Sequence, residues 1–185
     1  MREREREREN KHSRFSVLAF TLIELLVVVV IVGILAGMGI AQYKSYVNRA
    51  KDAKLMAELK MVQTALEAYF VDHETYKVKD SGYLGTGSGF LTFQTGNKYP
   101  ISVTNKLKEL KYLEINNPNI GENFKDTMIY TCNEGKSYHL YAKLHFPPAN
   151  GTNSLSSIPG DKCGKSLAIR YGKSNYVLKG GKPLE

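Results

Sequence analysis

One carboxylate lies near the start of an almost wholly apolar stretch of the chain. This residue, Glu24, is part of AFTLIELLVVVVIVGILAGMGIAQY, which runs from Ala19 to Tyr43. An ionised carboxylate within bilayer hydrocarbon costs about 2.5–3.5 kcal/mol or more. The residue types alone leave two interpretations, a hydrated position at the headgroup boundary or a partner of opposite charge.

Three glycines lie in the same stretch, at Gly33, Gly37 and Gly39. The first two form a GxxxG pattern, which lets helices approach closely in lipid. Each glycine also weakens a helix by about 1 kcal/mol relative to alanine. Helix packing and local unwinding in an assembly are therefore both open.

The two cysteines, Cys132 and Cys163, form no CxxC motif. An even count in an oxidising compartment favours one structural disulfide, because extracytoplasmic thiols pair readily. Closing a loop of about 30 residues in this way contributes about 3 kcal/mol.

Signatures of catalysis and metal binding are missing from the sequence. The four histidines (His12, His73, His139 and His145) show no HxxxH or HExxH spacing, and there is no GxSxG motif or P-loop lysine. We therefore predict no catalytic residues and no metal site of the histidine type.

The elements that position these residues begin with the apolar stretch itself. The 17 positions from Leu25 to Ala41 carry no charge, and as a helix they span about 25 Å, with neighbouring residues extending toward the hydrocarbon thickness. Six Lys and Arg residues precede the stretch. A basic flank favours keeping that end in the cytoplasm, so we expect a single-pass topology with the N-terminus inside.

The helical pattern continues beyond Tyr43. An apolar stripe recurs at intervals of four and three residues, as expected for one face of a helix: Leu55, Leu59, Val62, Leu66 and Tyr69. We therefore predict one helix from about Phe20 to about Val71.

The remainder reads as an α+β head. We expect a loop over 80–100, a short helix within 104–119, strands over 127–132, 137–146 and 176–178, a hairpin turn at 133–136, and a long loop over 147–166. The fold class is α+β, with one long N-terminal helix whose stripe covers one face of a small antiparallel sheet.

The run Phe20-Thr21-Leu22-Ile23-Glu24, followed by the apolar span, resembles the N-terminus of type IV filament subunits, the type IV pilins and type II secretion pseudopilins. In that family a prepilin peptidase cuts before the Phe and methylates the new amine. The resemblance implies a leader over 1–19, a transmembrane and filament-core helix over 20–43, and a head over 44–185. It places cleavage and methylation at Ala19 and Phe20, although Ala19 stands where the family usually has glycine.

The resemblance also implies that Glu24 acts in assembly, by pairing with the amine that cleavage exposes. Opposite charges about 4 Å apart gain about 4 kcal/mol at an effective dielectric constant of 20, comparable to the insertion penalty. The middle of the chain more loosely resembles major pseudopilins. That likeness allows a Ca²⁺ site at Asp161 and the ANGTNS loop, whose carboxylate count is low.

We therefore expect a structural subunit of a homo-oligomeric filament rather than an enzyme. Implied partners are the peptidase, an assembly ATPase, an inner-membrane platform protein and the lipid bilayer. Without residues 1–19 the chain has 20 Lys and Arg against 14 Asp and Glu, a net charge of +6, which leaves DNA as a further partner. The expected location is the cytoplasmic membrane for the precursor and an extracytoplasmic or cell-surface filament for the mature form. The alternative is a signal-anchored binding domain or enzyme that never polymerises.

Overall fold

The computed structural model describes residues 21–115, 120–158, 160 and 162–182. The expected leader, the cleavage residues Ala19 and Phe20, and Asp161 lie outside this part of the chain. The described residues divide into two compact units, with the boundary between Tyr43 and Lys44.

Helix α1 runs from Leu22 to His73. The predicted stripe on its second half is confirmed, because Leu59, Val62 and Leu66 are fully buried and the other stripe residues nearly so. The helix ends where Glu74 adopts a positive φ of 55° and donates its N–H to the carbonyl of Phe70. This left-handed residue closes the last turn, as is common at helix C-termini.

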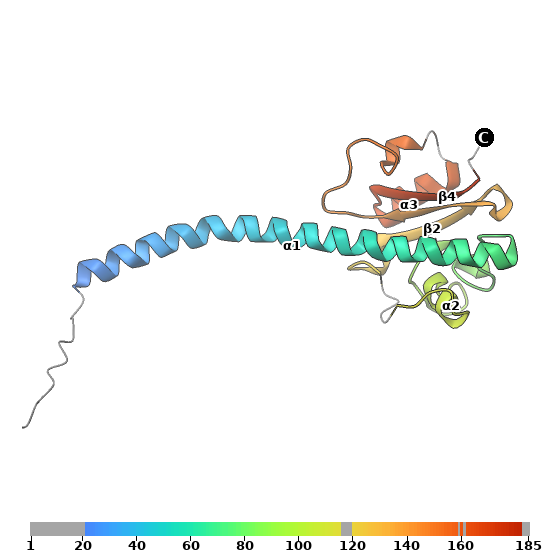
Figure 1. Cartoon of the computed structure of the whole chain (residues 1–185), viewed down its shortest axis with the longest axis horizontal. Coiled ribbons are helices and arrows are strands. Elements are labelled where there is room, and N and C mark those ends of the chain that lie inside the picture. Colours follow the sequence, from blue (N-terminus) through green and yellow to red (C-terminus); the bar gives the residue numbers. More distant parts are fainter. Residues whose placement is uncertain (1–20, 116–119, 159, 161, 183–185) are drawn as a thin grey trace, which may run out of the picture. The chain divides into compact units, whose positions relative to one another are not determined.

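A four-stranded antiparallel sheet follows, in the order β1-β2-β3-β4 (Figure 1). The strands are β1 (Gly89–Phe90), β2 (Thr127–Cys132), β3 (Ser137–Ala142) and β4 (Tyr176–Gly181). The expected hairpin joins β2 to β3, with Cys132 opposite Ser137. The connection turns through Asn133, Glu134 and Gly135, all of which have positive φ.

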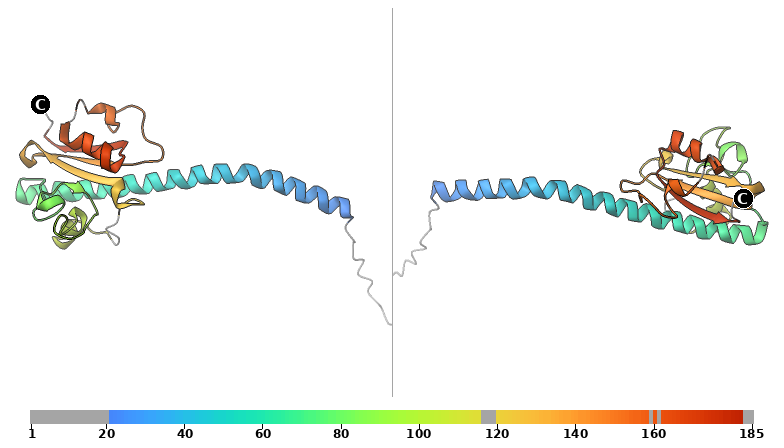
Figure 2. Two further views of the ribbon diagram at one scale, coloured as in Figure 1. Left: turned by 180° about the vertical axis from the view of Figure 1, so that it is seen from behind. Right: turned by 90° about the horizontal axis from the view of Figure 1, so that it is seen from above.

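Both faces of the sheet are covered, whereas the sequence predicted cover on one face. Alternate side chains of β3, such as Tyr138 and Leu140, join the stripe of α1 in the larger core. On the other face, Tyr141 packs with Ala168 of α3 (Lys165–Gly172) in a second, smaller core. Figures 1 and 2 show the strands between α3 and the second half of α1.

Several predicted boundaries were wrong. Helix α2 runs only from Val103 to Glu109, capped by Ser102, whose Oγ accepts a hydrogen bond from the N–H of Asn105. Strand β3 ends at Ala142 rather than at residue 146, and β4 extends to Gly181. Strand β1 and helix α3 were not predicted, and α3 begins within the segment expected to be a loop.

Candidate functional site

At the start of α1 the carboxylate of Glu24 is engaged by Thr21. Its Oε2 accepts hydrogen bonds from the backbone N–H and the hydroxyl of Thr21, both at 2.8 Å. In return, the N–H of Glu24 donates to the Thr21 hydroxyl at 3.3 Å. This reciprocal arrangement is a capping box, and the spacing Thr-x-x-Glu that encodes it was available in the sequence. Within the chain, Glu24 therefore satisfies the end of its own helix.

The side chains of the apolar segment that follows are exposed. Its large side chains from Leu22 to Ile40 are between 49% and 82% exposed. Among the described helices, α1 is the one that is long and apolar enough to cross a membrane. An apolar surface of this extent is unstable in water, so lipid or other protein must cover it.

The three glycines of this segment lie in regular helix. Apart from its chain neighbours and the adjacent turns of helix backbone, a Cβ atom added to Gly33, Gly37 or Gly39 would meet no atom within 4 Å. The chain's own packing therefore does not require them, and the helix is not interrupted where they occur. Any need for small residues here comes from molecules outside the chain.

The expected disulfide between Cys132 and Cys163 is present, with Cα atoms 5.6 Å apart. This separation is typical of disulfides. The bond ties the end of β2 to the short turn that precedes α3. It therefore fixes the beginning of the helix that covers the second face of the sheet.

A buried carboxylate, Asp52, joins α1 to the segment after β3. Asp52 is only 5% exposed. Its carboxylate accepts the backbone N–H groups of His145 at 2.9 Å and Phe146 at 2.8 Å, and lies 3.0 Å from the His145 ring nitrogen Nδ1. Sequence reasoning missed this contact, because a lone acid on an amphipathic helix reads as a surface residue.

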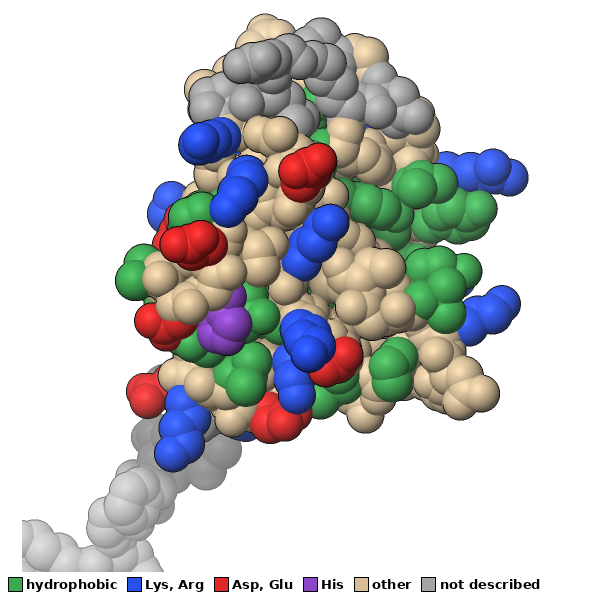
Figure 3. All heavy atoms as spheres, turned by 90° about the vertical axis from the view of Figure 1, so that its right-hand side faces the viewer, with side chains coloured by type: hydrophobic (Ala, Val, Ile, Leu, Met, Phe, Trp, Pro, Cys, Tyr) green, Lys and Arg blue, Asp and Glu red, His purple; other side chains and the backbone are tan. Residues whose placement is uncertain are grey.

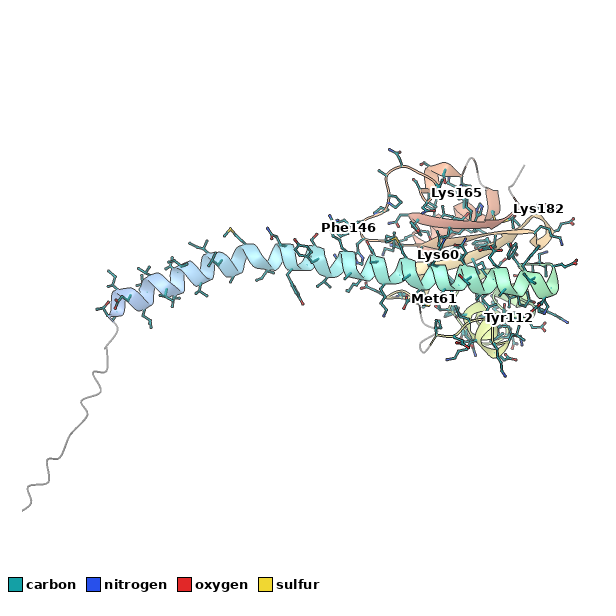
Figure 4. The ribbon with its side chains drawn as sticks, in the orientation of Figure 1. Lys60, Met61, Tyr112, Phe146, Lys165 and Lys182 are labelled. Carbon is teal, nitrogen blue, oxygen red and sulfur yellow. A yellow bond between two sulfur atoms is a disulfide. The ribbon has the colours of Figure 1, made fainter. Side chains whose placement is uncertain are left out.

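The charges around Asp52 form a small network. Burial alone would raise the pKa of Asp52, but the hydrogen bonds from His145 and Phe146 hold it below its usual value. The ammonium group of Lys51, 2.6 Å from Glu122, lowers the pKa of Glu122 through their hydrogen bond. The side chains of Lys51, Asp52, Glu122 and His145 are part of the lining of a cleft of about 360 Å³. Figure 4 shows that Phe146 lies at one end of the head and Lys182 at the other.

Within the described part of the chain, the remaining candidate ligands do not come together. Burial lowers the pKa of His139 to about 4, with a smaller effect from the charge of Lys179. This histidine is therefore neutral near pH 7. No group of three or more His, Cys, Asp or Glu side chains within the described residues is arranged to hold a metal ion. In the ANGTNS loop, the carbonyl of Thr152 already accepts a hydrogen bond from Ser157.

On the face of the head drawn in Figure 3, positive and negative side chains are mixed rather than gathered by sign. There, Lys and Arg side chains are interspersed with Asp and Glu. An electrostatic footprint for nucleic acid requires clustered basic residues. This face of the head does not provide one.

Comparison with known proteins identifies the N-terminal segment. The family described as the prokaryotic N-terminal methylation motif matches residues 15–40. That range contains Phe20, Glu24 and the three glycines of the apolar segment. No solved structure matches the chain.

Curated relatives point the same way. The chain is 41% identical over 75 residues to type IV major fimbrial protein FimA of Dichelobacter nodosus, which is 39% of this chain and 45% of the relative. It is 36% identical over 81 residues to type II secretion system core protein G of Pseudomonas aeruginosa, covering 44% and 54%. It is 36% identical over 56 residues to type IV major alpha-pilin of Moraxella bovis, covering 30% and 35%.

The chain thus spans about a third to a half of the length of these relatives. The matches confirm the resemblance to type IV fimbrial proteins and to a type II secretion protein. The names of these relatives describe fimbrial and secretion-system proteins rather than enzymes.

Proposed function

We propose that this chain is a structural subunit of a type IV pilus-like filament. It is made as a membrane-inserted precursor, cleaved between Ala19 and Phe20, methylated on the new amine and polymerised. The observation that carries the proposal is the apolar first half of α1, which is exposed along its length and lies within a match to the N-terminal methylation motif. Lipid covers this surface before assembly, and the helices of other copies cover it afterwards.

Glu24 acts as the residue that aligns incoming copies. Before cleavage its carboxylate accepts hydrogen bonds only from Thr21, among the described residues. Cleavage creates a cationic amine at Phe20, which is largely protonated near neutral pH. An amine about 4 Å from the carboxylate gains about 4 kcal/mol at an effective dielectric constant of 20. Since this amine can come from a neighbouring copy, the pair sets the axial position of each subunit.

Other molecules supply the chemistry and the energy. A prepilin peptidase cleaves and methylates, and an assembly ATPase acts through an inner-membrane platform protein. The precursor spans the cytoplasmic membrane with its N-terminus inside, and the mature head lies outside the cytoplasm. Binding of Ca²⁺ near Asp161 and binding of DNA by the filament stay predictions, tested by calorimetric titration with each ligand.

Mass spectrometry of the mature N-terminus tests the proposal. We expect a chain that begins with N-methylated Phe20. The variant Ala19→Gly should be cut at least as well, while Ala19→Leu, which adds bulk at the cut site, should remain full-length. An uncut wild-type chain, or one cut elsewhere, would favour a signal-anchored domain that does not polymerise.

Electron microscopy of sheared surface material, labelled with an antibody to the head, tests polymerisation itself. We expect labelled filaments from wild-type cells and none from the Ala19→Leu variant. The length of the labelled filaments distinguishes a surface pilus from a short secretion pseudopilus.

A further inference from the structure

An aromatic cleft of about 460 Å³ opens on the α3 side of the sheet, beside the edge strand β1. Four tyrosines line it, together with Phe90: Tyr83, Tyr99, Tyr130 and Tyr171. None of the described lining residues carries a charge. Tyr171, at 50% exposed, leaves much of its ring accessible to solvent. An apolar, concave site of this size is typical of a binding site.

The cleft is formed without a ligand. Gly89 has a φ of 111°, and a Cβ atom at this position would lie 2.9 Å from the Tyr99 hydroxyl. The ring of Tyr99 also packs edge-on against the ring of Phe93, with the ring centroids 5.0 Å apart. The ring of Tyr130 packs directly against Gly164, where a Cβ atom would clash with the ring. These contacts fix the rings in place, which lowers the entropy cost of binding.

Elsewhere on the head, an apolar segment is exposed and rigid. Phe146 is 46% exposed and is followed by Pro147 and Pro148, and we call these three residues the Phe-Pro knob. The backbone N–H of Phe146 is held by the Asp52 carboxylate at 2.8 Å. The guanidinium of Arg49 lies 4.9 Å from the centre of the Phe146 ring. Proline restricts both its own φ and the conformation of the residue before it, so the knob has few alternative shapes.

The knob and the cleft lie on different surfaces of the head. The knob is fastened to Asp52 on α1, which covers one face of the sheet. The cleft lies on the other face, where Met128 and Tyr130 of β2 pack toward α3. In Figure 4, Phe146 lies at one end of the head and away from Lys165, at the start of α3. A chain therefore does not fill its own cleft with its own knob.

We infer that the Phe-Pro knob of one copy docks into the aromatic cleft of a second copy. Grooves lined by aromatic side chains bind proline-rich segments, because the proline backbone is already extended. A contact between two different patches is heterologous, and heterologous contacts that do not close into a ring build helical filaments. The inference thus rests on the proposed filament function and adds a contact between heads to it.

Photo-crosslinking tests the contact in assembled material. We would place p-benzoylphenylalanine at position 146, where it keeps the aromatic ring, and irradiate sheared filaments of the full chain. Copies labelled with different isotopes identify crosslinks that join two chains. We expect peptides that contain Tyr83, Tyr99 or Tyr171 of another copy. Crosslinks to a different surface of the neighbour, to a foreign protein or to the same chain would each overturn the inference.

A charge exchange provides an independent test. Phe146→Glu and Tyr171→Lys should each lower filament yield by about tenfold or more, as expected for a central aromatic anchor. The double variant should regain part of that yield, because the two new charges attract. The control Val71→Glu adds a charge at a residue that is 79% exposed and belongs neither to the lining of the cleft nor to the knob, and it should leave the yield unchanged.

The two proposals can fail separately. If wild-type cells make no filament, the proposed function fails. If wild-type filaments form and both single variants match wild type, only the docking contact is wrong. Disulfide formation and membrane content, measured for each variant, show that the head has folded, so a lost filament is attributed to the contact.

Discussion

Asp52 and His145 are 93 positions apart in the sequence, yet the carboxylate of Asp52 binds both the backbone and the ring of His145. The two N–H···O bonds to the backbone of His145 and Phe146, at 2.9 and 2.8 Å, are short and charge-assisted. This contact fastens the chain beyond β3 to α1, and with it the exposed Phe146.

Replacing Asp52 with Asn should destabilise the head by about 2–3 kcal/mol, since hydrogen bonds to a charged group contribute about 1.5–3 kcal/mol. The amide retains one acceptor but places an N–H₂ group against the N–H donors. Thermal unfolding of the full chain in detergent, followed by near-ultraviolet circular dichroism, measures the change. The control Glu109→Gln removes an exposed partner of Lys106 and should cost at most about 1 kcal/mol. Equal effects of the two variants would contradict the structural role of Asp52.

The same carboxylate predicts a loss of stability in acid. Hydrogen bonds hold the pKa of Asp52 in the folded chain below its unfolded value, which is about 3.9. Such a group stabilises the fold above the unfolded pKa, and this stability is lost as the pH falls through the folded pKa. The groups that face it are His145, the N–H of Phe146 and Glu122, and Glu122 is itself paired with Lys51. We expect the unfolding temperature to fall less steeply below pH 4 in Asp52→Asn than in wild type.

Removing the disulfide should cost about 3 kcal/mol, since the bond closes a loop with a sequence separation of 31 residues. Unfolding of the double variant Cys132→Ser/Cys163→Ser in guanidinium measures this loss. Wild type treated with a reductant is the matched control and should approach the variant. If reduction leaves the wild-type midpoint unchanged, the bond does not contribute to stability.

We expect filament assembly to depend on the negative charge of Glu24 and not on its hydrogen bonds to Thr21. Both Glu24→Ala and Glu24→Gln should insert into the membrane normally but reduce filament yield. Thr21→Val removes the hydroxyl that binds Glu24 while leaving the charge, so it should still assemble. Membrane fractionation and electron microscopy provide the two readouts. Normal filaments from Glu24→Gln would show that the charge is not needed.

Two substitutions of Gly37 distinguish close packing between helices from local unwinding of the helix during assembly. Gly37 lies in regular helix with open space around it. If neighbouring helices pack against it, Gly37→Leu should reduce filament yield while Gly37→Ala is tolerated. If assembly instead needs the helix to unwind, Gly37→Ala should already reduce the yield, because alanine stabilises helix by about 1 kcal/mol. The continuous helix favours the first outcome.

The sequence predicted the elements that local patterns encode. The stripe from Leu55 to Tyr69 follows helical periodicity, and the β2–β3 hairpin follows alternation around a turn, so both were found. The larger core, which contains the apolar stripe of α1, could also be predicted from that periodicity.

The features that were missed depend on tertiary contacts. Strand β1 has two residues and exists through its pairing with β2. Helix α3 has eight residues in a segment rich in glycine, serine and proline, and Ala168 gains its burial only by packing on the sheet. Asp52 has no local signal at all, because its partners lie 93 and 94 positions further along the chain.

The disulfide also bears on how the head responds to a mechanical load. Strand β3 lies inside the segment that Cys132 and Cys163 close. A pulled chain that lacked this bond would release roughly 100 Å of extra length from the segment, at about 3.3–3.6 Å per residue. With the bond intact, a pulling force is transmitted through the two sulfur atoms and does not act on strand β3. In a fibre made of such heads, this segment cannot lengthen under traction as long as the two cysteines stay oxidised.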